Sequence, residues 1–364
     1  MNTQQDLLQR LHIDVPLLFS LIVLCGIGLV VLYSAAGQDT EVIVRQGIRI
    51  GLAFGLMFLV AQIPPFRIAR WAPWFYVLGI VLLALVLAVG DLGKGAQRWL
   101  DLGLFQIQPS EIMKIAVPMA VAWHLADKSL PPGLLRVIVA CFLIFIPVIM
   151  IARQPDLGTA VLVGAAGIAV LFLAGIRWRM IAAFGLLAAF CIPLVWYLMH
   201  DYQRLRILNF LDPQQDPLGA GWNIIQSNIA VGSGGLYGKG WLNGTQSHLE
   251  FLPERSTDFV FAVYCEEFGF MGVLLLLSLY GLVILRSVYI VMHAQNTFGR
   301  LLAGGLTLTF FVYIFVNMGM VTGQLPVVGI PLPLISFGGT SLVTLMAGFG
   351  ILMAIHTHRR LLSN

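Results

Sequence analysis

"FLPERSTDFVFAVYCEEFGFMGVLLLLSLYGLVIL", residues 251–285, is the stretch that decides the fold of this chain. Charged side chains crowd its first eight residues, whereas the run from Phe259 to Leu285 contains only Glu266 and Glu267 as charges. An apolar run of this length is long enough to cross a bilayer as an α-helix. The sequence therefore places Asp258 at a boundary between a polar loop and a membrane helix.

The composition of the whole chain agrees with a membrane protein. The chain has 364 residues, of which 59% are hydrophobic and 10% are charged, whereas a soluble domain is about 25% charged. We therefore predict an all-α polytopic membrane protein with a single domain over residues 1–364, because a β-barrel would need short alternating segments. The net charge of +4 is dispersed along the chain, so nucleic-acid binding is not predicted.

Uncharged stretches predict about ten transmembrane helices with a large extracytoplasmic loop, residues 200–258, between helices 7 and 8. The Gly- and Pro-rich segment "GQLPVVGIPLPLISFGGTS", residues 323–341, divides the last apolar region into two spans. The predicted helices lie near residues 15–35, 48–64, 72–90, 109–126, 134–152, 157–175, 180–199 and 259–285, with two more between 301 and 358.

The distribution of Lys and Arg predicts the orientation in the membrane. Placing both termini in the cytoplasm puts most cations of the short connecting segments on the cytoplasmic side, as the positive-inside rule requires. Arg45, Lys94 and Arg98 then fall outside, where that rule disfavours them. They are either solvated or in contact with lipid headgroups, or they form with Lys114 a cationic pocket that suits a phosphate or pyrophosphate.

Two further features carry candidate chemistry. Glu111 and Lys114 in "QPSEIMKIAVP" lie on one helical face, and a charge in mid-membrane costs about 2.5–3.5 kcal/mol. Glu111 alone suits the first turn of a helix, but Lys114 lies one turn deeper, so we favour a pair that faces a cavity.

Asp258 is either a helix cap or a general base, and the residues alone leave both open. No metal-ligand motif is found.

The motifs of the chain resemble those of the SEDS family (shape, elongation, division and sporulation). The matching segments include "KGAQRWLDLG", "QPSEIMKIAVP", "QPDLGT", "LPERSTDFVF" and "LPVVGIPLPLISFGG", which follow one another over nearly the whole chain. The segment "LPERSTDFVF" and the extended 200–258 loop are more similar to the elongation member of the family than to its division paralogue.

The resemblance implies a peptidoglycan glycosyltransferase that polymerises lipid II into β-1,4 glycan strands for cell elongation and rod shape. It implies a multi-pass protein of the bacterial inner membrane, acting on the periplasmic side within the elongation complex, with a class B penicillin-binding protein as transpeptidase partner. By residue, it implies Asp258 as the catalytic base and Glu111, Lys114, Arg45, Lys94 and Arg98 as substrate-binding residues.

The resemblance also implies that a divalent cation, Mg²⁺ or Mn²⁺, can assist the reaction. No carboxylate cluster in the sequence forms a dedicated metal site, so no metal ligand is assigned. Two alternatives of other classes stay open from the residues alone. A polytopic protein with intramembrane charges and a broken helix pair can transport lipid II across the membrane, or it can be a non-catalytic scaffold for the penicillin-binding protein.

Overall fold

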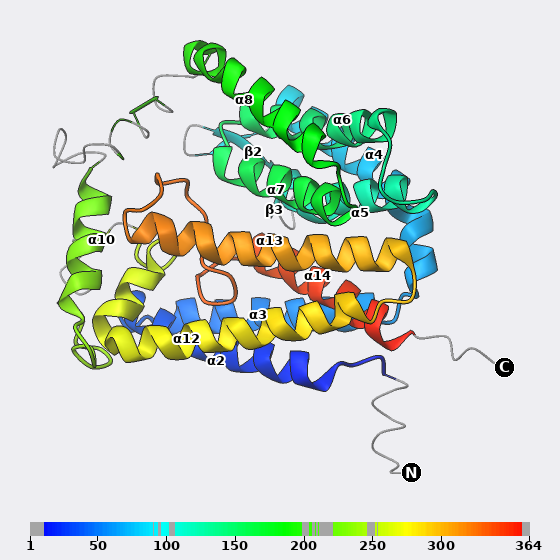
Figure 1. Ribbon diagram of the computed structural model, residues 1–364. Coiled ribbons are helices and arrows are strands. Elements are labelled where there is room, and N and C mark those ends of the chain that lie inside the picture. The colour runs from blue at the N-terminus through cyan, green and yellow to red at the C-terminus, as the bar shows by residue number, and fades with distance from the viewer. Residues whose placement is uncertain are drawn as a thin grey trace, which may run out of the picture.

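The computed structural model describes residues 11–89, 91–93, 96–101, 106–198, 204–205, 208, 210, 221–245, 252 and 254–358. Within these residues a helix lies at each of the ten predicted positions (Figure 1). These helices are α2 (Val15–Ala35), α3 (Thr40–Ala61), α4 (Pro65–Val89), α5 (Pro109–Ala126), α6 (Leu134–Arg153), α7 (Leu157–Leu173), α8 (Trp178–Leu198), α12 (Val260–Met292), α13 (Thr297–Val321) and α14 (Thr340–Thr357).

The structure corrects several predicted boundaries and adds elements in the connecting segments. Helix α3 begins at Thr40 because the side chain of Asp39 caps it, so Arg45 and Arg49 lie inside the helix rather than before it. A three-stranded antiparallel sheet, which the all-α prediction lacked, follows α4. Its strands are β1 (Asp91–Gly93), β2 (Ala96–Asp101) and β3 (Gln106–Ile107), in the order β1-β2-β3. A short helix, α10 (Trp222–Ser233), lies between α8 and α12 in the chain.

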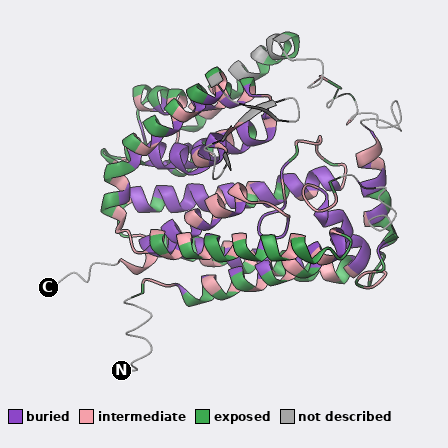
Figure 2. Ribbon diagram, turned by 180° about the vertical axis from the view of Figure 1, so that it is seen from behind, coloured by how far each residue is buried: buried purple, intermediate pink, exposed green. Residues whose placement is uncertain are grey.

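The burial pattern is that of a bundle surrounded by lipid. Helices α5 and α13 lie at the centre, and Figure 2 shows that the outer helices carry most of the exposed residues. Large apolar side chains on those helices are exposed, including Trp74 and Leu135 at 75% each. Among the described residues, seven helices are long and apolar enough to cross a membrane: α2, α3, α4, α6, α12, α13 and α14. The prediction of about ten spans therefore stays a prediction, although helices occupy all ten positions.

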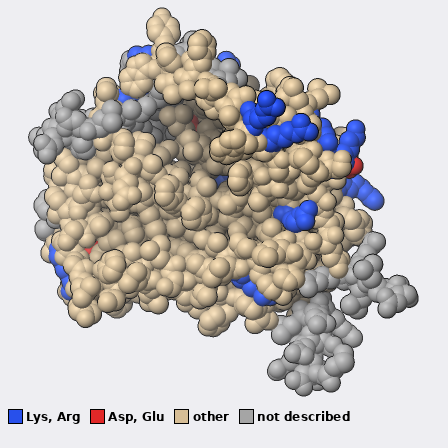
Figure 3. Space-filling view, in the orientation of Figure 1, with Lys and Arg blue, Asp and Glu red and all other residues tan. Residues whose placement is uncertain are grey.

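The two ends of the described chain lie together at one end of the bundle. The imidazole of His12 stacks on that of His358, with ring centroids 3.7 Å apart, and its Nδ1 lies 3.2 Å from the hydroxyl of Thr357. Most of the Lys and Arg side chains visible in Figure 3 gather toward the end of the molecule that carries the N and C labels in Figure 1. The two ends of the described chain therefore lie on the same side of the bundle.

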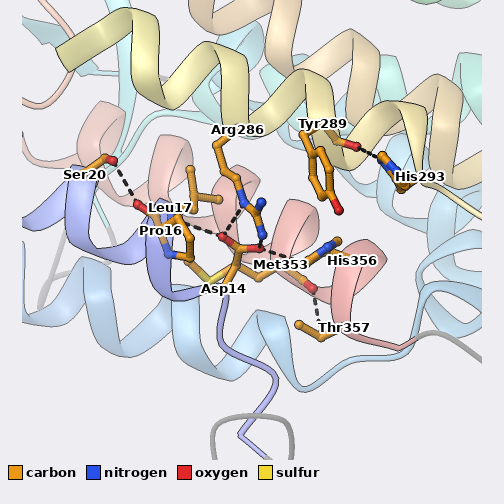
Figure 4. A network of polar contacts seen from close by, with 10 residues as sticks. All are labelled: Asp14, Pro16, Leu17, Ser20, Arg286, Tyr289, His293, Met353, His356 and Thr357. Atoms are coloured by element: carbon orange, nitrogen blue, oxygen red, sulfur yellow. Dashed lines mark hydrogen bonds and ion pairs between the residues drawn. The ribbon is translucent and has the colours of Figure 1, made fainter. Parts of the chain in front are cut away.

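Asp14 joins three helices at this end (Figure 4). Its carboxylate caps α2 by accepting from the amide of Leu17, and it accepts two hydrogen bonds, of 3.0 and 2.8 Å, from Arg286 of α12. The Nδ1 atom of His356, from α14, lies 2.8 Å from the same carboxylate. Burial by itself raises the pKa of Asp14, but the contacts with His356, Arg286 and the Leu17 amide outweigh it and hold the pKa well below the ordinary value of 3.8.

We expect Asp14→Asn to lower the free energy of unfolding by about 1.5–3 kcal/mol at pH 7, because hydrogen bonds to a charged group are lost while the cap is retained. A carboxyl whose pKa is lowered on folding stabilises the protein above its unfolded pKa and loses this effect as the pH falls through its folded pKa. The difference between wild type and Asp14→Asn should therefore shrink below about pH 3.8. Thermal unfolding in detergent at several pH values measures it.

The control is Asp39→Asn, which alters an exposed cap of α3 whose carboxylate, among the described residues, bonds locally to the amide of Glu41. Asp39→Asn should change stability by no more than a few tenths of a kcal/mol, since Asn and Asp cap about equally well. Equal effects of the two substitutions would show that the Asp14 ion pair contributes nothing.

Helix α12 is broken at Gly269, whose backbone has φ 63° and ψ −164°. The turn that follows α10 inserts into the break and bonds backbone groups that the helix leaves unpaired there. Four backbone hydrogen bonds of 2.9–3.1 Å cross the break: Lys239 to Glu266, Gly240 to Glu267, Phe270 to Gly235, and Met271 to Leu236.

The two buried glutamates of α12 belong to this junction. The carboxylate of Glu266 accepts from the ammonium of Lys239 at 2.7 Å and from the amide of Thr245 at 2.9 Å. The carboxylate of Glu267 accepts from the hydroxyl of Ser34 in α2. Glu266 and Glu267 therefore attach the broken helix to α2 and to the turn after α10, which explains charges that are costly within an apolar helix.

We expect Gly269→Ala to destabilise the protein by at least about 1–3 kcal/mol, because its backbone conformation is essentially restricted to glycine. A Cβ atom at this position would also collide with the backbone of Gly238 in the inserted turn. Gly281→Ala in the same helix is the matched control, since its Cβ would meet nothing within 4 Å. Thermal unfolding of both variants tests this, and a Gly269→Ala protein as stable as Gly281→Ala would contradict it.

Candidate active site

A polar cleft of about 240 Å³ opens at the end of the bundle opposite the termini. Four helices begin at it: α5, α7, α12 and α14. The segment between α13 and α14, residues 322–339, forms another part of its wall. The polar side chains among its lining residues are Gln108, Glu111, Lys114, Asp156, Thr159, Thr257, Asp258, Tyr313, Thr340 and Ser341. Glu111, Lys114 and Asp258, which the sequence predicted as site residues, thus share one cavity.

The start of each helix directs a partial positive charge toward the cleft. The cap positions of α5, α12 and α14 are Gln108, Phe259 and Gly339, and none of them makes a side-chain capping bond. Only α7 has such a cap, from Asp156. Helix starts without capping side chains favour a bound anion.

Glu111 and Lys114 form a buried ion pair, as their spacing predicted. The ammonium of Lys114 donates to Oε1 of Glu111 and to the hydroxyl of Tyr313, both at 2.6 Å. The side chains of Lys114 and Glu111 are only 7% and 8% exposed. An ammonium carries three donors, so one N–H of Lys114 is left for a group in the cleft after these two described contacts. Oε2 of Glu111 is buried without a hydrogen-bond partner among the described residues.

Asp258 is a half-buried residue that lines the same cleft from the turn before α12. The helix-cap alternative for Asp258 loses support, because Phe259 rather than Asp258 occupies the cap position of α12. Gly329 packs beside the carboxylate, since a Cβ atom there would lie 3.4 Å from Oδ2 of Asp258.

Gln108, Asp156, Tyr313 and Trp99 also line the cleft, although none of them was predicted as a site residue. Asp156 caps α7, since its Oδ1 accepts from the amide of Thr159 at 3.3 Å, and its Oδ2 also accepts from Gln108 at 2.9 Å. Tyr313 reaches Lys114 from α13, and Trp99 comes from strand β2. Gln108 and Asp156 lie inside the quoted motifs "QPSEIMKIAVP" and "QPDLGT", which could have identified them as site residues. No quoted motif contains Tyr313.

The predicted cationic pocket is only partly visible. Arg45 is not among the lining residues and pairs with Glu41 on the surface of α3. Arg49, one turn later, lies with its guanidinium 4.5 Å from the ring centroid of Phe337, which lines the cleft. Arg98 belongs to β2, and Lys94 lies outside the described residues. Arg49 is thus an arginine beside the cleft wall that the predicted pocket did not include.

An apolar pocket continues from the polar cleft into the bundle. It shares Lys114, Tyr313 and Ser341 with the cleft and runs between α5, α13 and α14. Its other lining residues are mainly apolar, among them Ile115, Leu306, Phe310, Leu345 and Phe349. Lys114 therefore marks a boundary between a polar and an apolar cavity, an arrangement that suits an amphiphilic ligand.

The donor set does not fit a resident metal ion. Among the described residues, no three His, Cys, Asp or Glu side chains come close enough together to hold one. Glu111, Asp156 and Asp258 line the same cleft but lie on different walls, and Glu111 and Asp156 are already engaged by Lys114 and Gln108.

Comparison with known proteins gives consistent results. The family FTSW_RODA_SPOVE, described as cell cycle protein, matches residues 15–361. The peptidoglycan glycosyltransferase MrdB of Escherichia coli K12 is 55% identical over 97% of this chain and 96% of its own length.

Two solved structures are similar over 94% of the chain. One is described as "Structural coordination of polymerization and crosslinking by a peptidoglycan synthase complex" and has a TM-score of 0.82 at 36% identity, covering 97% of that chain. The other is the rod shape determining protein RodA of Thermus thermophilus, with a TM-score of 0.72 at 31% identity and 96% coverage of its chain. These similarities agree with the resemblance to the elongation member.

Proposed function

The chain belongs to the FTSW_RODA_SPOVE family of cell cycle proteins, and from this membership we propose that it polymerises lipid II with Asp258 as the general base. The chain is a peptidoglycan glycosyltransferase, as the 55% identity to MrdB over nearly the full length of both proteins indicates. The observation that carries the catalytic proposal is the cleft that brings Asp258 together with the buried pair of Glu111 and Lys114.

The reaction joins two lipid II molecules. The 4-hydroxyl of GlcNAc on one molecule attacks C1 of MurNAc on the other, and Asp258 takes the hydroxyl proton. The bond from C1 to the pyrophosphate breaks, the undecaprenyl pyrophosphate leaves, and a β-1,4 bond forms with inversion. Asp258 suits this role because its carboxylate lies in the cleft and leaves the cap position of α12 to Phe259.

The leaving pyrophosphate needs stabilisation as it gains charge. The third N–H of Lys114 and the uncapped starts of α5, α12 and α14 are donors suited to its oxygens. Arg49 beside Phe337 can add a cation from the rim, and Arg45, Lys94 and Arg98 stay predicted substrate contacts. The apolar pocket below Lys114 suits the lipid part of the same substrate.

In the proposed mechanism no divalent cation is assigned to a permanent site on the protein. Because the described carboxylates form no metal cage, we propose that any Mg²⁺ or Mn²⁺ arrives with the pyrophosphate and is held mainly by its oxygens.

The chain acts as a single membrane domain of about ten spans in the inner membrane. We place both termini in the cytoplasm, because Lys and Arg gather at the end of the bundle where the two ends of the described chain meet. The cleft then opens on the periplasmic side. A class B penicillin-binding protein is the proposed partner, supported by the similarity to the structure that couples polymerisation and crosslinking.

The experiment that tests this proposal incubates purified protein with fluorescent lipid II, with and without its penicillin-binding protein. Glycan polymer, resolved on a gel and digested by a muramidase, is the expected product. A transporter or a scaffold yields no polymer from lipid II that is already accessible, so the absence of product with a folded protein and its partner would favour those alternatives.

A further inference from the structure

Three successive backbone carbonyls, of Ser256, Thr257 and Asp258, are held by the chain that follows α12. The amide of Phe337 donates to Ser256 at 2.8 Å, the hydroxyl of Ser336 donates to Thr257 at 2.5 Å, and Nδ2 of Asn317 donates to Asp258 at 3.0 Å. Ser336 and Phe337 belong to segment 322–339, whereas Asn317 lies in α13.

These bonds hold a part of the backbone that the helix does not. Helix α12 begins only at Val260, so residues 256–258 form a turn outside the helical hydrogen-bond ladder. A carboxylate attached to an unrestrained turn would sample many positions, whereas a base must stay within hydrogen-bond reach of its proton. Bonds that hold this backbone therefore limit where the Asp258 carboxylate can lie.

The donors themselves are firmly placed. Asn317 is fully buried, and the same Nδ2 also donates to the carbonyl of Ile330 at 2.6 Å, which uses both hydrogens of one amide group. The hydroxyl of Ser336 also accepts from the amide of Leu332 at 2.7 Å. Asn317 thus bonds both the turn that carries Asp258 and the segment 322–339 that lines the cleft beside it.

The segment is in turn attached to the rest of the bundle. The hydroxyl of Tyr280 in α12 donates to the carbonyl of Pro333 at 2.6 Å. Gly28 of α2 packs closely against the same segment, since a Cβ atom added to Gly28 would lie 2.6 Å from the carbonyl of Leu334. The Gly- and Pro-rich stretch that separates the last two helices is therefore a fixed support rather than a loose connection.

We propose that Asn317 and Ser336 are positioning residues that hold the backbone of Asp258 so that its carboxylate meets the attacking hydroxyl. This inference rests on the proposed role of Asp258 as the base. In this proposal neither side chain contacts the substrate. Both act through the turn at 256–258, which carries Asp258.

The test measures kcat and KM for fluorescent lipid II in the full-length protein with its partner. Ser336→Ala and Asn317→Leu should each lower kcat by roughly 10- to 100-fold, since a displacement of about 1 Å can cost about 100-fold. KM should stay within about threefold, because substrate binding is not altered. Ser336→Thr retains the hydroxyl and should recover most of the rate. Ser287→Ala is the matched control: it removes a buried hydroxyl of α12 whose bond among the described residues is to Val283, in its own helix.

A Ser336→Ala protein with wild-type kcat, or with a loss no larger than that of Ser287→Ala, would overturn the inference. If Asn317→Leu fails to fold, the comparison of Ser336→Ala, Ser336→Thr and Ser287→Ala decides. Asp258→Asn separates this inference from the proposed function. Loss of activity in Asp258→Asn with full activity in Ser336→Ala rejects only the positioning role, whereas full activity in Asp258→Asn rejects the base and the inference together.

Discussion

Asp258→Asn is expected to fold, to bind lipid II and to polymerise it about 10²–10⁴-fold more slowly than the wild type, which is the usual contribution of a general base. Asn has nearly the same shape as Asp, and its side chain cannot accept the hydroxyl proton. The substitution should leave α12 intact, because Phe259 occupies its cap position and Asn317 bonds the backbone rather than the side chain of residue 258. A gel of fluorescent glycan products, with thermal unfolding alongside, measures both effects.

Two further variants locate the effect at the carboxylate. Asp258→Glu keeps the charge but moves it by roughly 1 Å, which can cost about 100-fold in rate. Glu254→Gln removes an exposed carboxylate four residues earlier, in the same turn, and should have a much smaller effect because Glu254 is not among the residues that line the cleft. A stable Asp258→Asn protein that polymerises normally would reject the proposed base.

Lys114→Met is the second substitution for which we expect a large effect. It should lower both the polymerisation rate and the stability of the protein. Removing the ammonium leaves the buried carboxylate of Glu111 without its partner, and breaking a buried pair in this way costs about 3–5 kcal/mol. Polymerisation should fall by about 10²–10³-fold, the usual loss when one donor to a developing negative charge is removed.

The double variant Glu111→Gln/Lys114→Met separates these two effects. It leaves no unpaired charge, so its thermal stability should return close to that of the wild type, as neutral replacements of buried pairs often do. Its polymerisation rate should stay as low as that of Lys114→Met, because the cation for the pyrophosphate is still absent. If the double variant recovered activity together with stability, the pair would have a purely structural role.

The local features of this protein were largely predictable from its sequence. The positions of all ten helices follow from apolar runs, and the pairing of Glu111 with Lys114 follows from their i,i+3 spacing within one helix. The capping role of Asp156 follows from its place before the apolar run of α7. Each of these depends on residues a few positions apart, whose relative geometry a helix fixes without help from the rest of the chain.

The composition of the site was decided by the tertiary structure. Tyr313 beside Lys114, Arg49 beside Phe337, and Asn317 on the carbonyl of Asp258 join residues that are far apart in sequence. Hydrophobic periodicity could not reveal them, because in lipid the outer faces of the helices are as apolar as their inner faces and do not indicate which helices meet. The break at Gly269 and the turn inserted into it escaped prediction for a related reason: backbone carbonyls and amides carry no sequence signal until packing brings their partners together.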